Sequence, residues 1–147
     1  VVNQSGACAW TLWPTMRAIG LTPRRVAVDS RMSTSAAAPS EMLDDVAAVI
    51  DALWKGPDTL VVVSTDLSHY HRYADAIRMD ARTARAIAEL RSADIMAEAA
   101  CGSLPLRGLL RTAADRQLAI EQLDLRNSGD TAGDKNRVVG YGAFALS

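Results

Sequence analysis

The amino-acid sequence predicts an α/β fold, because helical and strand patterns alternate along the chain from about residue 40 to the end. The clearest strand signal is the run from Leu60 to Val63, in which apolar residues follow one another without alternation. Such a run is typical of an inner strand of a parallel sheet that is covered on both faces. With 147 residues and 49% hydrophobic residues, the chain has enough length and apolar content for one core.

The first helix and the first clear strand are predicted between residues 40 and 64. The helix begins near Ser40, a suitable cap, and stops at Gly56 and Pro57. A strand over residues 59 to 64 follows directly. The apolar residues that define the buried face of the helix are Leu43, Val46, Ala47, Ile50, Leu53 and Trp54.

The second half of the chain continues this alternation. Apolar residues at helical spacing predict a helix over 77–88, a short helix from about residue 93, and another helix around Pro105. Strands are predicted over 118–125 and 137–146. The segment 127–135 is rich in glycine and acids but fits neither a P-loop nor an EF-hand, so we interpret it as a turn between these two strands.

Side chains suited to catalysis or metal binding follow the strand at 59–64. Asp66, His69 and His71 stand beyond its carboxyl end, where open α/β sheets bind ligands. A carboxylate and two imidazoles on a loop anchored by a rigid strand favour acid-base chemistry or metal binding. The structural alternative is that Asp66 caps a turn and the histidines are solvated, and these residues alone do not decide between the two interpretations.

Cys101 lies in a tight turn before a helix that Ser103 could cap and whose first turn suits Pro105. The positive end of a helix dipole favours the thiolate, which binds metals or attacks electrophiles. The alternative is a small buried apolar side chain, and the spacing alone favours that alternative.

Taken together, these segments resemble the Memo family, also known as AmmeMemoRadiSam system protein B. The resemblance rests on Val62 to Tyr70, on Ala100 to Gly102 followed by a Pro-x-x-Gly-Leu-Leu helix, and on the end of the chain. There, Leu125 to Thr131 and Val138 to Ala145 are similar to the closing loop and strand of the family. The order and intervals of these segments match from about Ser40 to Leu146.

Membership implies a three-layer α/β/α fold similar to the class III extradiol dioxygenases, although a reaction does not follow from a fold. In Memo-like proteins the pocket holds a redox metal, iron or copper, bound by two early histidines and one late cysteine. By motif, Cys101 matches the cysteine ligand. Asp66 and His69 match pocket residues beside the metal, as supporting or proton-transfer groups. His71 lies outside the matched pattern and is interpreted as a loop residue.

The two histidine ligands of the family are absent from this chain. The segments of the Pro-His-Ala-Gly and Gly-Pro-x-His-His kind that carry them do not occur, and the only histidines are His69 and His71. We therefore expect a fragment, in which residues 40–147 are the carboxy-terminal part of a Memo-like domain. Residues 1–39 do not resemble what the family carries there, and we interpret them as a divergent or frame-shifted arm with little regular structure. An ordinary irregular arm is the alternative.

Composition excludes several classes of partner. A formal net charge of -1 provides no attraction to nucleic acid or anionic membranes. No apolar stretch approaches the ~20 residues of a membrane span. Cys8 and Cys101 are too few and too far apart for a disulfide framework, so a cytoplasmic location is the default. An incomplete sheet exposes apolar surface, so we expect a protein partner or a homo-oligomer.

Two function classes follow from these observations. The first is a metal-dependent redox role in the intact parent protein, carried by Cys101, Asp66 and His69. The second is a non-catalytic interaction module, or an inactive remnant, that retains the fold. A serine hydrolase based on Ser68 and His69 has the least support, because the chain has no Gly-x-Ser-x-Gly segment.

Overall fold

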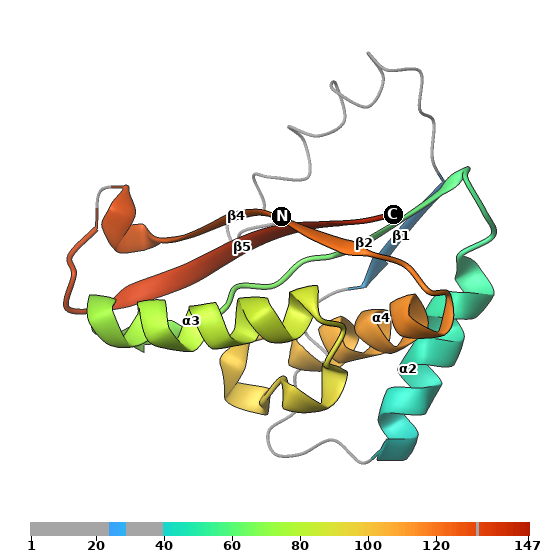
Figure 1. The fold of residues 1–147 in the computed structure, drawn as a ribbon, viewed down its shortest axis with the longest axis horizontal. Helices are drawn as coiled ribbons and strands as arrows, with labels where there is room; N and C mark the ends of the chain where they lie inside the picture. The colour runs from blue at the N-terminus through green and yellow to red at the C-terminus, as the bar shows by residue number, and fades with distance from the viewer. Residues whose placement is uncertain (1–23, 29–39, 132) are drawn as a thin grey trace.

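The computed structural model describes residues 24–28, 40–131 and 133–147 of the chain. Helices α2 (Ser40–Leu53), α3 (Tyr73–Ala88) and α4 (Ser103–Asp115) lie along one side of the described strands (Figure 1). The predicted α/β class is therefore confirmed, and the described residues form one layer of strands and one layer of helices. None of the described helices combines the length and apolar character needed to cross a bilayer.

The strands form one parallel pair and one antiparallel sheet. β1 (Arg24–Val28) pairs in parallel with β2 (Thr59–Val63). β5 (Val138–Leu146) is the central strand of the antiparallel sheet, between β3 (His69–His71) and β4 (Ile120–Asn127). The strand predicted over 59–64 thus has a parallel neighbour as expected, but its side chains are half-buried rather than fully enclosed.

The structure corrects four predictions about local structure. β1 lies in the arm that was predicted to hold little regular structure, because its five residues are too few to give a periodic signal without the partner strand β2. The rest of that arm, residues 1–23 and 29–39, lies outside the described residues.

The short helix predicted near residue 93 is two 3-10 turns, η2 (Ser92–Asp94) and η3 (Ala97–Ala99). Ser103 is buried as the first residue of α4, which begins without a side-chain cap. The fourth correction concerns residues 69–71, which form a strand instead of a loop because β5 provides backbone partners.

The core consists of two apolar clusters that meet at α4. One packs α3 and the segment before α4 against Leu67, Leu106 and Leu110. The other packs α2 against α4 through Leu43, Val46, Ile50, Leu104 and Leu109. The predicted buried face is confirmed for Leu43, Val46, Ala47 and Ile50. Trp54 is partly buried, whereas Leu53 at the end of the helix is exposed. Since α4 belongs to both clusters, its position fixes the turn that carries Cys101 at its amino-terminal end.

Gly108 lets α4 approach α2 closely. A Cβ atom at this position would lie 2.4 Å from Cγ1 of Val46. Thr112, one turn further along α4, donates a hydrogen bond to the carbonyl of Ala47 across the same contact at 3.1 Å. Alanine here would gain helix propensity but would force the two helices apart.

We expect Gly108→Ala to lower the free energy of unfolding by about 1–2 kcal/mol, because overpacking outweighs the gain in helix propensity. Urea unfolding followed by circular dichroism measures this change. The control is a double-mutant cycle with Val46→Ala, which removes the obstructing methyl groups. Gly108→Ala should cost clearly less in the Val46→Ala background. Equal costs in both backgrounds would show that this contact does not limit the packing of the two helices.

Candidate metal site

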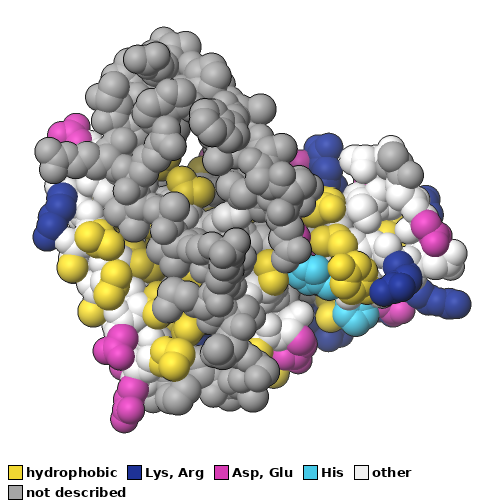
Figure 2. Space-filling model, turned by 180° about the vertical axis from the view of Figure 1, so that it is seen from behind, with side chains coloured by type: hydrophobic (Ala, Val, Ile, Leu, Met, Phe, Trp, Pro, Cys, Tyr) yellow, Lys and Arg dark blue, Asp and Glu magenta, His cyan; other side chains and the backbone are white. Residues whose placement is uncertain are grey.

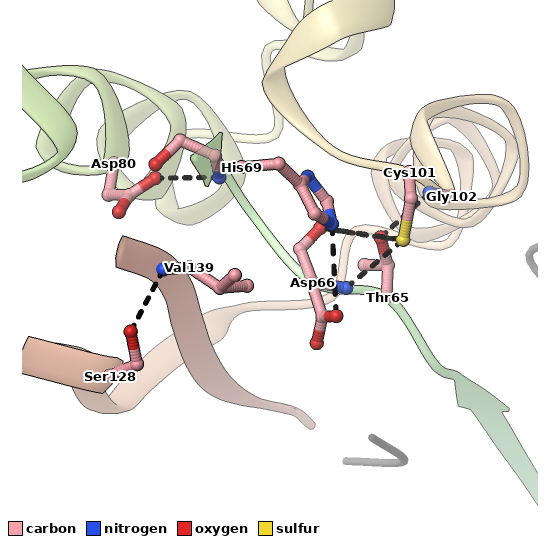
Figure 3. A network of polar contacts seen from close by, with 9 residues as sticks. Thr65, Asp66, His69, Asp80, Cys101, Gly102, Ser128 and Val139 are labelled. Carbon is pink, nitrogen blue, oxygen red and sulfur yellow. Dashed lines mark hydrogen bonds and ion pairs between the residues drawn. The ribbon is translucent and has the colours of Figure 1, made fainter. Parts of the chain in front are cut away.

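Asp66, His69 and Cys101 come together beyond the carboxyl end of β2. One ligand atom from each residue lies within 4.8 Å of the others. Oδ2 of Asp66 lies 3.8 Å from Nε2 of His69. Figure 3 shows the three side chains facing one another from the loop after β2, from β3 and from the turn before α4. The structure thus brings together all three residues that the sequence predicted for the site.

Hydrogen bonds connect the loop after β2 to the Cys101 turn, although 35 positions separate Asp66 from Cys101. The N–H of Cys101 donates to the carbonyl of Asp66 at 3.3 Å. In return, the N–H of Asp66 donates to Sγ of Cys101 at 3.4 Å. The N–H of Gly102 donates to Oγ1 of Thr65 at 2.8 Å. These reciprocal contacts place the thiol directly beside the loop that carries the carboxylate.

Gly102 and Thr65 are site residues that the sequence interpretation missed. A Cβ atom on residue 102 would lie 2.9 Å from Cβ of Thr65, so the close approach of the two segments requires glycine. The hydroxyl of Thr65 donates to the carbonyl of Asp66 at 2.8 Å and also lies 3.5 Å from Sγ of Cys101. In the sequence, these two residues stand directly beside the candidate residues Asp66 and Cys101. Only the fold shows that the two segments contact each other.

β5 holds the loop from its other side. The N–H of Leu67 donates to the carbonyl of Gly140 at 2.9 Å, and the N–H of Gly140 donates to the carbonyl of Ser68 at 2.8 Å. His69 then pairs with Val139 at the start of β3. The register shifts after His69, and the intervening Tyr70 has a φ of 61°, a strained value for a residue with a side chain. This irregularity sits next to a candidate functional side chain, as stored backbone strain often does.

His71 is exposed and does not belong to the group formed by Asp66, His69 and Cys101. Its predicted place in a loop is wrong, because it pairs with Val138 as the last residue of β3. The two histidines lie beside hydrophobic and basic side chains on the face shown in Figure 2. Arg137 covers the ring of Tyr70 on this part of the surface, with 5.0 Å from its guanidinium carbon to the ring centre.

Burial sets the charge state of the carboxylate. Asp66 is only 7% exposed, and this burial raises the pKa of its carboxyl, while the nearby His69 acts in the opposite direction. Tyr141 on β5 has a raised pKa because it is partly desolvated and faces the negative charge of Asp66. Tyr141 is therefore a neighbour of the site that the sequence interpretation did not identify.

The side chains present fit a transition-metal ion. A carboxylate, an imidazole and a thiolate are ligands that iron and copper accept in proteins. Ligand bonds of about 2.0–2.3 Å to one ion require donor atoms a few ångströms apart, and the separations of up to 4.8 Å approach this range. Three donors leave coordination positions open for a further ligand or a substrate.

A neighbouring apolar cavity lies next to the site but does not contain it. The cavity has a volume of about 440 Å³ and is lined mainly by apolar side chains of β2, α4 and β5. Thr65 and Leu67 contribute to its wall, whereas Asp66, His69 and Cys101 do not. The three candidate residues therefore form a separate, more polar group at the end of this cavity.

The raised pKa of Asp66 predicts a pH-dependent stability for the metal-free protein. Because the folded pKa lies above the ordinary 3.8, the folded state retains a proton that the unfolded chain releases. This stabilising contribution is complete below pH 3.8 and is lost as the pH rises through the folded pKa. Asp66→Asn, which stays neutral, should therefore gain stability relative to the wild type as the pH rises from 3.8 through the folded pKa of Asp66.

Urea unfolding in the presence of a chelator, at several pH values in this range, measures that difference. Asp75→Asn is the matched control, because it makes the same substitution at a carboxylate in the first turn of α3 that is exposed to solvent. A difference between Asp66→Asn and wild type that stays constant with pH, or falls as the pH rises, would contradict the proposed effect of burial.

Comparison with known proteins identifies the family of this chain. A family model described as "Memo-like protein" matches residues 34–145. A "MEMO1 family protein" from Aeropyrum pernix is 31% identical to the chain over 97 residues, which cover 62% of this chain and 34% of that protein. The matched part thus spans about a third of the length of the relative. Asp66, His69 and Cys101 all lie inside the region that the family model matches. Because this model covers most of the sequence, the chain belongs to the Memo family.

Proposed function

We propose that the chain forms part of a redox-metal pocket for iron or copper, with Cys101 as a ligand and with Asp66 and His69 as acid-base groups beside the ion. The observation that carries this proposal is the convergence of the three ligand atoms within 4.8 Å. Membership of the Memo family supports it, and all three residues lie in segments through which the chain resembles that family.

Cys101 is the group best suited to bind the ion directly. A thiolate is a soft donor that suits copper and iron. The N–H of Asp66, 3.4 Å from Sγ, donates a hydrogen bond to the sulfur and helps to hold it in place. The residue is a free cysteine and is only partly buried, so an ion can reach it. A reducing cytoplasm suits such a thiol, and this location is part of the proposal.

Asp66 and His69 are suited to hold and transfer a proton. Their side chains are 3.8 Å apart, and the imidazole is 27% exposed whereas the carboxylate is 10% exposed. Burial raises the pKa of Asp66, so its carboxyl holds a proton to a higher pH than an exposed carboxyl does. A proton on the buried carboxylate can therefore be exchanged with His69 and, through it, with solvent. An iron or copper ion bound at Cys101 would supply one-electron chemistry next to this pair.

The site in this chain is incomplete by the standard of its family. The segments that carry the two histidine ligands of the family do not occur in the sequence. We propose that the intact parent protein supplies them, together with a second layer of helices on the side of the strands opposite α2, α3 and α4. That arrangement would be the three-layer fold of the class III extradiol dioxygenases.

We expect the chain alone to bind Fe(II) or Cu(I) weakly, because one thiolate, with Asp66 and His69 beside the ion, leaves most coordination positions empty. Anaerobic titration against a competing chelator measures the affinity. Cys101→Ser should weaken binding by at least about tenfold, the loss of about 1.4 kcal/mol, and His69→Gln should weaken it less.

His71→Gln is the matched control for His69→Gln, since it changes the exposed imidazole two positions away and should leave the affinity unchanged. Tight, stoichiometric binding that Cys101→Ser does not affect would show that the ion binds elsewhere. A chain that binds neither metal would favour the alternative function, an interaction module or inactive remnant that retains the fold.

The expected protein partner or homo-oligomer is also a proposal, and the surface of α2 supports it. Met42, Val49 and Leu53 are 40%, 56% and 45% exposed and follow one another along one side of the helix. This stripe runs beside the buried face of α2. Apolar side chains grouped in this way are more typical of an interface than of a free surface.

Sedimentation velocity at increasing protein concentration tests this proposal, with association as the expected result. Val49→Glu should shift the protein towards the monomer, because a carboxylate in an apolar contact must lose its hydration. Ala48→Glu, at an exposed position outside this stripe, is the control and should have no effect. A wild-type chain that stays monomeric throughout would exclude self-association through α2.

A further inference from the structure

Asp80 is a buried acid that the proposed function does not use. It lies within α3 and is only 3% exposed. Its Oδ1 accepts a hydrogen bond from the backbone N–H of Ser68 at 3.0 Å. Ser68 lies between the two candidate acid-base residues, Asp66 and His69, in the sequence, so the carboxylate holds the backbone of the loop at its centre. Figure 3 shows Asp80 beside this loop.

The surroundings of Asp80 fix its carboxylate in this position. A Cβ atom on Gly140 would lie 2.1 Å from Oδ2 of Asp80, so β5 can pass the carboxylate only because residue 140 is glycine. The same Gly140 makes backbone hydrogen bonds with Leu67 and Ser68. The carboxylate, the loop and β5 therefore form one packed unit.

Two further observations indicate a purpose beyond packing. Ser68 is fully buried, so its N–H, which donates to Asp80, has no access to water. Burial also raises the pKa of Asp80, while the N–H and hydroxyl of Ser68 and the charges of His71 and His69 oppose this shift. An apolar side chain of similar size would avoid the cost of desolvating a carboxylate here. A carboxylate at this position therefore costs stability, and the hydrogen bond that it accepts from Ser68 is the reason for its presence.

We propose that Asp80 is a positioning residue for the candidate metal site: through the N–H of Ser68 it holds the loop in the shape that directs Asp66 and His69 towards Cys101. This inference deepens the proposed function and rests on it for its metal-binding consequences. The arrangement of the side chains in the metal-free protein, however, can be tested independently. The property that matters is the acceptor oxygen, and asparagine retains that oxygen whereas leucine, which has the same branched shape, does not.

The experiment compares the wild type with Asp80→Asn, Asp80→Leu and the control Asp75→Asn, after circular dichroism has shown that each variant folds. The first readout is the set of nuclear Overhauser contacts between the His69 ring and the Cys101 side chain in the metal-free protein. The second is a titration with Co(II), whose thiolate charge-transfer absorption reports Cys101 and whose ligand-field bands report the other donors.

We expect Asp80→Asn and Asp75→Asn to keep the Overhauser contacts and to bind Co(II) within about twofold of wild type. Asp80→Leu should lose the contacts and weaken Co(II) binding by about tenfold, since the buried N–H of Ser68 loses its acceptor. Its thiolate absorption should persist while the ligand-field bands change. A purely structural role would lower stability in Asp80→Leu without changing these spectra in the folded fraction.

Gly140→Ala provides a second route if Asp80→Leu does not fold. The added methyl group displaces the same carboxylate from the side of β5 and should also weaken the contacts between His69 and Cys101. If folded Asp80→Leu or Gly140→Ala keeps the Overhauser contacts between His69 and Cys101 unchanged, the positioning role is overturned. A wild-type protein that shows these contacts but binds no Co(II) would instead count against the proposed function and leave the positioning role supported.

Discussion

The candidate site depends on the reciprocal hydrogen bonds between the loop after β2 and the turn before α4. The N–H of Asp66 reaches Sγ of Cys101, the N–H of Cys101 reaches the carbonyl of Asp66, and the N–H of Gly102 reaches Thr65. Each of these groups would lose a partner if the two segments moved apart, and a buried unpaired N–H is costly. The packing of α4 against α2 and α3 keeps the turn in place. The position of the thiol beside the carboxylate is thus a consequence of the core.

Most of the regular structure followed from sequence patterns, and the exceptions have physical reasons. α2, α3 and α4 carry apolar residues at helical spacing, and β4 and β5 lie close to their predicted positions. β1 and β3 were missed because strands of five and three residues are defined by their partners rather than by their own composition. The half-buried state of β2 could not be predicted, since it depends on what covers the strand.

The candidate residues themselves were predictable, but their arrangement was not. Asp66, His69 and Cys101 stood out through residue type, motif and position after a strand or before a helix. Their convergence within 4.8 Å required tertiary packing that no spacing rule provides. Asp80 gave no signal at all, because an acid within a helical pattern is normally interpreted as a solvated side chain. Only its burial against Gly140 and its bond to Ser68 show that it supports the loop.

X-ray absorption spectroscopy of the protein loaded with one equivalent of iron or copper tests the central claim most directly. One sulfur scatterer at about 2.3 Å, with the remaining ligands nitrogen or oxygen, is the result expected if Cys101 binds the ion beside Asp66 and His69. The sulfur contribution should disappear in Cys101→Ser and remain in His71→Gln. A metal environment of nitrogen and oxygen alone in the wild type, or a sulfur contribution that survives Cys101→Ser, would contradict the assignment of this site.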